Sequence, residues 1–272
     1  MQVGKATAVP EALLAAPLST KSLEHVRERL ARRHLGTLGG GNHFVELDRD
    51  VSGGVWLLVH SGSRGLGSAV ADHHLKAAEA AGLGDIPGLP LDSDPGRGCL
   101  ADIRWALEFA AANREALLVA AARVVEEVAG AMPEAASRID VHHNFVNEEE
   151  HLGRRLWVHR KGAIAALAGS RVLIPGSMGT ASYIAEGLGE PTSFRSASHG
   201  AGRVMTRREA RERIPVDRLA HAMRRIVHDE RRVATLVEEA PAAYRDIGEV
   251  LEDEADLISP LLRLEPLAVL KG

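Results

Sequence analysis

The sequence predicts a mixed α/β (α+β) fold in which one domain covers residues 1–272. Three observations support this prediction. Residues 101–132 form a long alanine-rich stretch typical of helix, short apolar runs between glycine-rich turns are typical of strands, and hydrophobic residues make up 45% of the chain. Aromatic residues are only 3%, so the core must rest on Leu, Val, Ile and Ala. No internal repeat, low-complexity tract or linker divides the chain, and a single domain is the simplest interpretation.

Four stretches have the apolar spacing of helices. Residues 23–34 carry apolar side chains at helical intervals, with Ser22 as the expected N-cap. Residues 101–132 predict one bent helix or two. The stretches 216–228 and 244–258 predict two further helices.

Short apolar runs bounded by turn residues predict the strands. The run at 55–59 is continuous and predicts a buried strand that ends at His60. Residues 82–98 are rich in Gly, Pro and Asp and predict a loop. The other predicted strands are residues 44–47, 139–143, 171–174 and 264–270.

The net charge of −4 argues against binding of nucleic acid over the whole surface. If RNA is bound, the positive charge must be gathered locally, although charged runs are usually solvated helix faces. The candidate clusters are Arg154, Arg155, Arg160 and Lys161; Arg203, Arg207, Arg208, Arg211 and Arg213; and Arg224, Arg225, Arg231 and Arg232.

The single cysteine, Cys99, leaves no partner for a disulfide within these residues and is typical of a reducing compartment. It lies where the predicted loop meets the long helix, and we expect it to pack rather than to bind metal. The first twenty residues lack the charged and apolar regions of a signal peptide. No apolar run approaches the roughly 20 residues that span a bilayer. The sequence therefore predicts a cytoplasmic protein.

Four of the thirteen histidines lie at the ends of apolar runs or beside glycines, namely His43, His60, His143 and His199. Side chains in such places can meet a ligand while the backbone stays fixed. Each of them taken singly is more often structural, but four in similar settings favour a site. Imidazole suits zinc, manganese, iron and nickel, so the residues alone do not choose the metal.

Two glycine turns are typical of phosphate cradles. Residues 175–180, Pro-Gly-Ser-Met-Gly-Thr, follow the strand at 171–174 and offer backbone N–H groups and hydroxyls. Residues 200–203, Gly-Ala-Gly-Arg, offer a flexible turn with a guanidinium. Neither turn matches the P-loop pattern, and by pattern alone two ordinary glycine turns are an equal alternative.

Taken in order, these segments closely resemble the RtcB family of RNA ligases, over residues 35–272. The resemblance implies a single RtcB-like catalytic domain with central β-sheets flanked by helices. The matching segments are Leu-Gly-Thr-Leu-Gly-Gly-Gly-Asn-His-Phe-Val-Glu (35–46), His-Ser-Gly-Ser-Arg-Gly-Leu-Gly (60–67), His-His-Asn-Phe-Val (142–146), Arg-Lys-Gly-Ala (160–163), Pro-Gly-Ser-Met-Gly-Thr (175–180), Ser-His-Gly-Ala-Gly-Arg-Val-Met (198–205) and the terminal Leu-Lys-Gly.

The resemblance implies a GTP-dependent ligase that acts in tRNA splicing or RNA repair. Family members join an RNA 3′-phosphate or 2′,3′-cyclic phosphate to a 5′-hydroxyl through a histidine–GMP intermediate. His199 matches the histidine that carries the guanylyl group, so it is the expected catalytic residue. His43, His60 and His143 match ligands of manganese, and the complete family site is expected to hold two ions.

The same resemblance implies the residues that bind the guanylate. Lys271 would reach the nucleotide from the end of the chain. Arg64 and Arg203 lie inside the motifs and are expected to contact phosphates of RNA or GTP. The implied guanylate-binding residues are Asn42, His43, Phe44, Val45, Glu46, His143, Asn144, Pro175, Gly176, Ser177, Met178, Ser182, His199, Gly200, Ala201, Gly202 and Lys271.

Family members also carry an N-terminal Asp-x-Gly-Cys-Gly element, whose aspartate and cysteine complete the metal site. The 34 residues before Leu35 hold no such element, and Cys99 lies between the His60 and His143 motifs. We therefore expect a chain truncated at its N-terminus relative to the family, a separate polypeptide or activating protein that completes it, or a divergent member. The alternatives to an active ligase are a nucleotide- or RNA-binding protein with impaired ligation and a metal-dependent phosphoesterase.

Overall fold

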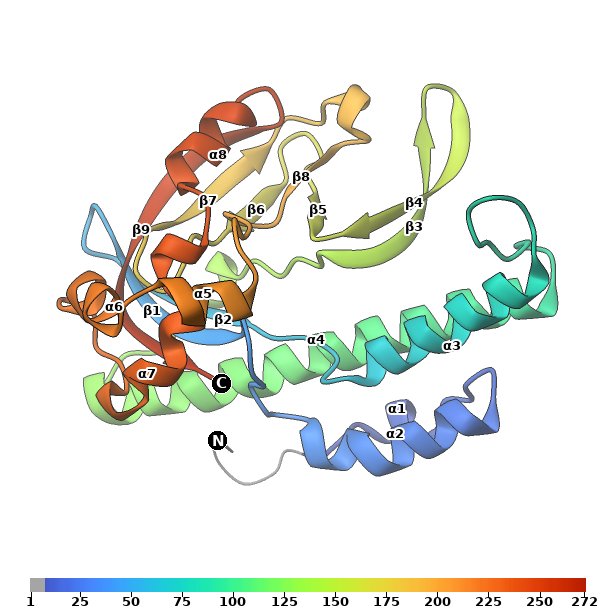
Figure 1. Cartoon of the computed structure of the whole chain (residues 1–272), viewed down its shortest axis with the longest axis horizontal. Coiled ribbons are helices and arrows are strands. Elements are labelled where there is room, and N and C mark those ends of the chain that lie inside the picture. The colour runs from blue at the N-terminus through green and yellow to red at the C-terminus, as the bar shows by residue number, and fades with distance from the viewer. Residues whose placement is uncertain (1–7) are drawn as a thin grey trace. The chain divides into compact units, whose positions relative to one another are not determined.

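The computed structural model describes residues 8–272. Residues 1–7, which belong to the twenty residues that lack a signal-peptide pattern, lie outside the described residues. The described chain divides into two compact units. We call residues 8–39 and 59–130 the helical unit, and residues 40–58 and 131–272 the sheet unit. Their elements, labelled in Figure 1, are the helices and strands of the mixed α/β fold that the sequence predicts. The assignment of residues 1–272 to a single domain stays a prediction.

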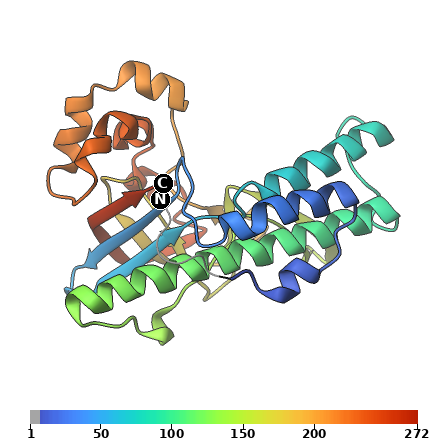
Figure 2. The same ribbon diagram turned by 90° about the horizontal axis from the view of Figure 1, so that it is seen from below.

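The helical unit consists of helices packed on an apolar core that includes the buried residues Leu66, Trp105 and Phe109. Figures 1 and 2 both show α3 running alongside the long helix α4. The helices of this unit are α1 (Glu11–Ala15), α2 (Lys21–His34), α3 (Leu66–Ala81) and α4 (Asp94–Ala129). None of the described helices is long and apolar enough to cross a membrane. The cytoplasmic location stays a prediction.

Capping side chains set where α2 and α4 begin. Thr20 caps α2, because its hydroxyl accepts a backbone N–H of the first turn, so the predicted N-cap at Ser22 is wrong. The hydroxyl of Ser93 caps α4 in the same way, and the helix begins at Asp94. The predicted loop at 82–98 therefore ends earlier than expected. Helix α4 continues unbroken for 36 residues, so the alternative of two helices is also wrong.

Within the described residues, a five-stranded sheet forms the centre of the sheet unit, in the order β2-β1-β9-β7-β6. The long strand β9 pairs antiparallel with both β1 and β7. The predicted strands at 44–47, 171–174 and 264–270 are confirmed as parts of β1, β6 and β9. β2 is an edge strand and Val55 is 61% exposed, so its predicted burial is wrong. The strands are β1 (Phe44–Asp50), β2 (Val55–His60), β6 (Arg171–Ile174), β7 (Ser182–Gly187) and β9 (Ile258–Lys271).

Two smaller antiparallel ladders extend the sheet unit, one between β3 and β4 and one between β5 and β8. Their strands are β3 (Asn144–His151), β4 (Arg154–Lys161), β5 (Ala163–Ala165) and β8 (Ser196–Ser198). The strand predicted at 139–143 is wrong, because this stretch is irregular and pairing begins only at Asn144. Ile139 and Val141 instead pack against the two apolar cores of the unit.

Alternate residues of β7 face these two cores. Ile184 belongs to the cluster that includes α5 and α6, and Ala185 belongs to the cluster that includes α8. Helices α6 and α8 are shorter than predicted, because Val227 forms a bridge to β9 and Ile258 already begins β9. The helices and 3-10 turns of this unit are α5 (Arg207–Arg213), α6 (Val216–Met223), α7 (Val233–Leu236), α8 (Ile247–Asp253), η1 (Ala135–Ser137), η2 (Pro191–Ser193), η3 (Glu230–Arg232), η4 (Val237–Glu239) and η5 (Pro241–Ala243).

Candidate functional site

His199 directly follows β8, and the residue before it is held on two sides. Ser198, the last residue of β8, pairs with Ala163 of β5. Its N–H and its hydroxyl both donate to the carboxylate of Glu254, each at 2.9 Å. Glu254 lies at the C-terminal end of α8. Strand pairing and a charged acceptor therefore fix the backbone from which the His199 side chain projects.

The His199 ring is oriented by the carbonyl oxygen of Gly162, which lies 2.7 Å from Nδ1. A carbonyl oxygen only accepts hydrogen bonds, so Nδ1 carries the proton and Nε2 of the neutral ring keeps its lone pair. A lone pair on a fixed nitrogen is what a nucleophile requires. This geometry makes Nε2 the atom of His199 that is able to attack.

The surroundings of His199 also favour its neutral form. Burial lowers the pKa of His199 from its usual 6.5, the hydrogen bond to Gly162 raises this pKa, and the nearby charge of Lys161 lowers it again. The net effect is a lowered pKa, so the ring is neutral near pH 7. The ring of His143 stacks on it, with 4.7 Å between centroids and 29° between planes. The stacked neighbour fixes the plane of the His199 ring.

Gly162 joins three of the motif segments. Its N–H donates to the carbonyl oxygen of His143 at 2.7 Å and to Oδ1 of Asn144 at 2.9 Å, while its own carbonyl accepts from His199. Its φ of +66° lies in the left-handed region, and a Cβ there would lie 3.3 Å from Cε1 of His199. Three motif segments that are separate in the sequence therefore meet at this glycine, for which the sequence predicts no role.

The two predicted phosphate cradles lie against each other. Ala201 donates its N–H to the carbonyl oxygen of Pro175 at 3.0 Å. Gly200 has a φ of +152°, and a Cβ there would come within 2.7 Å of the same oxygen, so the close approach requires glycine. In the preceding turn, the N–H of Ser177 donates to Oγ1 of Thr180 at 2.7 Å. The turn after β6 is thus closed on itself and held against the segment that follows β8.

The remaining predicted residues of these turns differ in what they present. The side chain of Met178 is buried in the core, so its backbone is the part that a ligand can contact. Ser182 is buried, and its Oγ accepts the N–H of Gly176 at 3.4 Å. Gly202 is exposed and has a φ of +71°. At these three positions, a phosphate would therefore contact backbone groups and not side chains.

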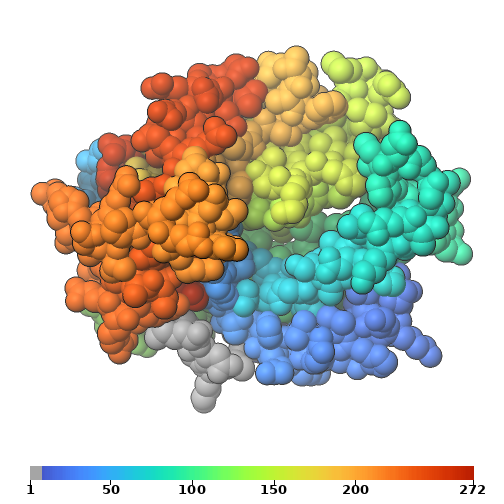
Figure 3. All heavy atoms as spheres, in the orientation of Figure 1, coloured from blue at the N-terminus to red at the C-terminus, as the bar shows by residue number. Residues whose placement is uncertain are grey.

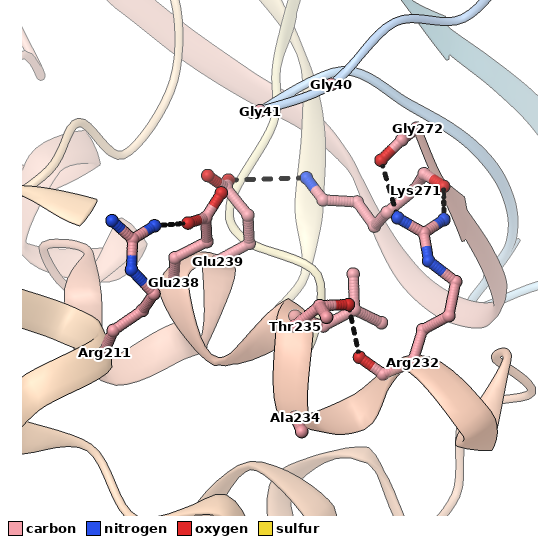
Figure 4. A pocket seen from close by; sticks show the side chains of 11 residues that line it. Gly40, Gly41, Arg211, Arg232, Ala234, Thr235, Glu238, Glu239, Lys271 and Gly272 are labelled. Atoms are coloured by element: carbon pink, nitrogen blue, oxygen red, sulfur yellow. Dashed lines mark hydrogen bonds and ion pairs between the residues drawn. The ribbon is translucent and has the colours of Figure 1, made fainter. Parts of the chain in front are cut away.

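Another group of predicted residues lies where the end of β9 meets the start of β1. Lys271 pairs with Phe44 across the two strands, and its Nζ lies 5.6 Å from the centre of the Phe44 ring. The adjacent pair is Val45 with Leu270. Nζ of the buried Lys271 also lies 3.5 Å from Oε2 of Glu239, and both residues line a cavity of about 390 Å³ (Figure 4). Gly40, Gly41, Arg211, Arg232 and Thr235 also line the cavity.

Glu46 and Asp48 lie on the buried face of β1, on the same side as Phe44. Burial and the adjacent charge of Asp48 raise the pKa of Glu46 well above its usual value, while Lys271 opposes the rise. Asp48 is fully buried, and burial raises its pKa to about 6. Two buried carboxyls this close cannot both be charged without a large electrostatic cost.

Glu239 is the residue of this region that sequence reasoning missed. It ends the turn η4, is only 3% exposed, and has Lys271, Arg203, Arg207 and Tyr244 as partners. The sequence holds two consecutive glutamates at this place, and a solvated glutamate and a buried one look alike in a sequence. Only the fold identifies the buried member of the pair.

The three histidines predicted to bind manganese are divided between the two units. His43 and His143 belong to the sheet unit, and His60, the last residue of β2, falls among the residues of the helical unit. Arg64 is also in the helical unit, where its Nε donates to Oγ1 of Thr37 at 3.1 Å. Among residues 8–272, no group of three or more His, Cys, Asp or Glu side chains is gathered closely enough to hold a metal ion. The manganese site stays a prediction.

Residues 7–272 match the profile of a protein family described as tRNA-splicing ligase RtcB. The chain is similar to the RNA-splicing ligase RtcB of Escherichia coli (strain K12), with 38% identity over 254 residues that cover 88% of this chain and 62% of the relative. The RNA-splicing ligase RtcB of Mycobacterium tuberculosis is 33% identical over 301 residues, which cover 95% of this chain and 68% of the relative. The tRNA-splicing ligase RtcB of Pyrococcus horikoshii is 34% identical over 301 residues, which cover 92% of this chain and 35% of the relative. The chain thus spans less than two thirds of the Escherichia coli relative.

Proposed function

The chain belongs to the RtcB family, and on that premise we propose that it is an RNA ligase that uses GTP. It joins an RNA end with a 3′-phosphate or 2′,3′-cyclic phosphate to an end with a 5′-hydroxyl, in tRNA splicing or RNA repair. The observation that carries the proposal is the orientation of His199. Its Nδ1 donates to Gly162 and its Nε2 keeps a lone pair, as covalent catalysis by a histidine requires.

In the first step, Nε2 of His199 attacks the α-phosphorus of GTP. A nitrogen–phosphorus bond forms while the bond to the bridging oxygen breaks, and pyrophosphate leaves with that electron pair. The lowered pKa of His199 means that the attacking nitrogen has no proton to lose. An oxygen of the RNA 3′-phosphate then takes the guanylyl group and releases the imidazole. Finally the 5′-hydroxyl loses its proton, attacks the activated phosphate and displaces GMP.

The guanylate occupies the turns next to His199 and the cavity at the end of β9. The closed turns after β6 and β8 suit phosphate, because glycines let a ligand approach their backbone N–H groups. The ammonium of Lys271 suits an acceptor of the nucleotide, such as O6 of guanine. Asn42 to Glu46 lie beside the cavity, since Gly41 lines it and Phe44 pairs with Lys271.

Manganese belongs to the proposal as the ion that neutralises the triphosphate when it is bound. The residues that would hold it are His43, His60 and His143. Residues 8–272 contain no cluster of three donors, and Nδ1 of His143 already accepts a hydrogen bond from Asn144 at 3.0 Å. The described donor set does not by itself fit a complete metal site.

RNA needs a locally positive surface on a chain whose net charge is −4. Helices α5 and α6 and the turn after them supply one, because exposed arginines gather there. Four of them, Arg207, Arg208, Arg211 and Arg213, pair with glutamates, so the charge is only partly neutralised. The segment, orange in Figure 3, lies on the viewed surface of the sheet unit. Its exposed arginines are Arg207, Arg208, Arg211, Arg213, Arg218, Arg224 and Arg225.

The test is the joining of two synthetic RNAs, one ending in a 3′-phosphate and the other starting with a 5′-hydroxyl. The full chain should join them only when GTP and manganese are present. His199→Ala should abolish joining, and His159→Ala, an exposed histidine of β4, should not. Absence of joining by the folded chain, or joining that persists in His199→Ala, would overturn the proposal. Hydrolysis of cyclic phosphate ends without GTP would favour a phosphoesterase instead.

A further inference from the structure

One buried carboxylate links three cationic side chains of the sheet unit. Oε1 of Glu239 lies 3.1 Å from Nη1 of Arg203 and 3.0 Å from Nε of Arg207. Its Oε2 lies 3.5 Å from Nζ of Lys271 and accepts the hydroxyl hydrogen of Tyr244. With 3% of its surface exposed, Glu239 has exchanged water for these four partners.

The partners come from separate parts of the chain that border the proposed guanylate site. Arg203 directly follows Gly202 in the segment that begins with His199. Arg207 lies against Gly41, where a Cβ would come within 2.6 Å of its Nη2. Lys271 ends β9 and lines the cavity, and its ammonium points to the carboxylate of Glu239 (Figure 4). Glu239 itself sits on a turn that none of the motifs includes.

The contacts hold Lys271 as an ammonium in a buried place. Burial lowers the pKa of Lys271, and Glu239 opposes this effect most strongly, followed by Glu46. Glu239 remains a carboxylate, because Lys271, Tyr244, Arg207 and Arg203 together outweigh the rise in its pKa that burial causes. Without Glu239, the lysine is left with the Glu46 carboxyl, whose pKa is raised well above its usual value.

We propose that Glu239 is a positioning residue that holds Lys271 at the guanylate cavity, with Arg203, Arg207 and Tyr244 fixing the carboxylate. This inference rests on the proposed function, since it assigns the residue that prepares the same site for GTP. Glu239 acts through Lys271 and does not touch the reacting atoms. Its loss should therefore weaken GTP binding and leave the attack by His199 nearly unchanged.

The experiment measures the rate at which the full chain forms its covalent GMP adduct, as a function of GTP concentration. Glu239→Gln should raise the GTP concentration for half-maximal rate about tenfold, because a charge-assisted contact to Lys271 is lost. The maximal rate should stay close to that of the unaltered chain. Glu212→Gln removes the same charge from an exposed pair with Arg208 on α5 and should change neither quantity.

A double-mutant cycle tests whether Glu239 acts through the lysine. Lys271→Met should raise the half-maximal GTP concentration by at least as much as Glu239→Gln. The double variant should be no worse than Lys271→Met alone, because the lost interaction is the same. Effects that multiply in the double variant would overturn the inference, as would a Glu239→Gln variant that behaves like Glu212→Gln.

A second readout does not depend on ligase activity. Acetylation of Lys271 by limiting acetic anhydride, followed by mass spectrometry, reports how much of the amine is uncharged. Glu239→Gln should increase this labelling at pH 8, and Glu239→Asp, which keeps the charge, should restore part of the protection. Labelling that is unchanged in a folded Glu239→Gln would contradict the contact itself. An unaltered chain that forms no adduct but shows the labelling change would overturn the proposed function and leave the Glu239–Lys271 contact standing.

Discussion

Nδ1 of His199 donates to the carbonyl oxygen of Gly162 over 2.7 Å, and the N–H of the same glycine is bonded to His143 and Asn144. The hydrogen bond selects the tautomer of His199 and leaves Nε2 as the nitrogen with a lone pair. The glycine also couples the ring to the segment that carries its stacked neighbour, His143. Changes at Gly162 should therefore affect the reaction of His199 as well as folding.

Gly162→Ala should slow formation of the GMP adduct at saturating GTP by about tenfold or more, because the new Cβ presses on the His199 ring. Gly169→Ala is the matched control. It has a similar φ of +75° but open space around the Cβ position. Both variants should lose about 1 kcal/mol of stability from backbone strain, measured by urea unfolding. Equal adduct rates in the two variants would show that Gly162 does not orient His199.

The pH dependence of adduct formation should follow the lowered pKa of His199. Because only the neutral ring attacks, the rate should fall to half its plateau value at a pH below 6.5. Lys161→Met should move this midpoint upward, since the lysine charge lowers the pKa of His199. Arg154→Met, at the other end of β4 and about 20 Å away along the strand, should not move it. A midpoint above 6.5 would contradict the assignment of the neutral nucleophile.

Glu254→Gln should reduce the adduct rate by about tenfold, because the carboxylate accepts from both the N–H and the hydroxyl of Ser198. The amide that replaces it offers only one oxygen for these two donors. Glu252→Gln, an exposed position on the same helix, is the control and should react at the rate of the unaltered chain. The measurement is the rate of adduct formation by both variants at fixed pH and saturating GTP. Equal rates for the two variants would show that Glu254 does not position His199.

Asp48→Asn should stabilise the protein at pH 8 but not at pH 3.5. Burial raises the pKa of Asp48 from 3.8 to about 6, so its contribution to stability is fully present below pH 3.8 and is lost as the pH rises through about 6. Removing the charge should recover on the order of 2 kcal/mol at pH 8, measured by urea unfolding. The exposed Asp253→Asn should show no such difference between the two pH values. A destabilised Asp48→Asn at pH 8 would mean that the carboxylate is charged and well solvated.

The periodicity of apolar side chains correctly predicted those helices and strands that bury one of their faces. The strand at 171–174 and the helix that follows Thr20 are of this kind, since their side chains repeat at the strand and helix spacing. The prediction at 139–143 was wrong because apolar side chains can pack against a core without strand pairing, as the partly buried Ile139 does. Helix α3 was not predicted, because Gly67 and two histidines interrupt its apolar pattern.

The motifs predicted His199 and its glycine turns because each places a histidine or several glycines at or near the end of an apolar run. Glu239 and Glu254 carry no such signal, since a glutamate becomes a structural anchor only when the fold brings donors to it from elsewhere in the chain. Gly162 lies within a recognised motif, yet its contact with His199 depends on a left-handed φ that the sequence does not display.

The most direct measurement is the position of the covalent GMP. The full chain is incubated with GTP and manganese, digested under alkaline conditions that spare a phosphoramidate, and mapped by tandem mass spectrometry. The guanylyl group should be found on His199, should be absent from His199→Ala, and should be present in the exposed control His159→Ala. Guanylylation of a lysine or of another histidine, or an adduct that survives in His199→Ala, would contradict the role of His199 as the nucleophile.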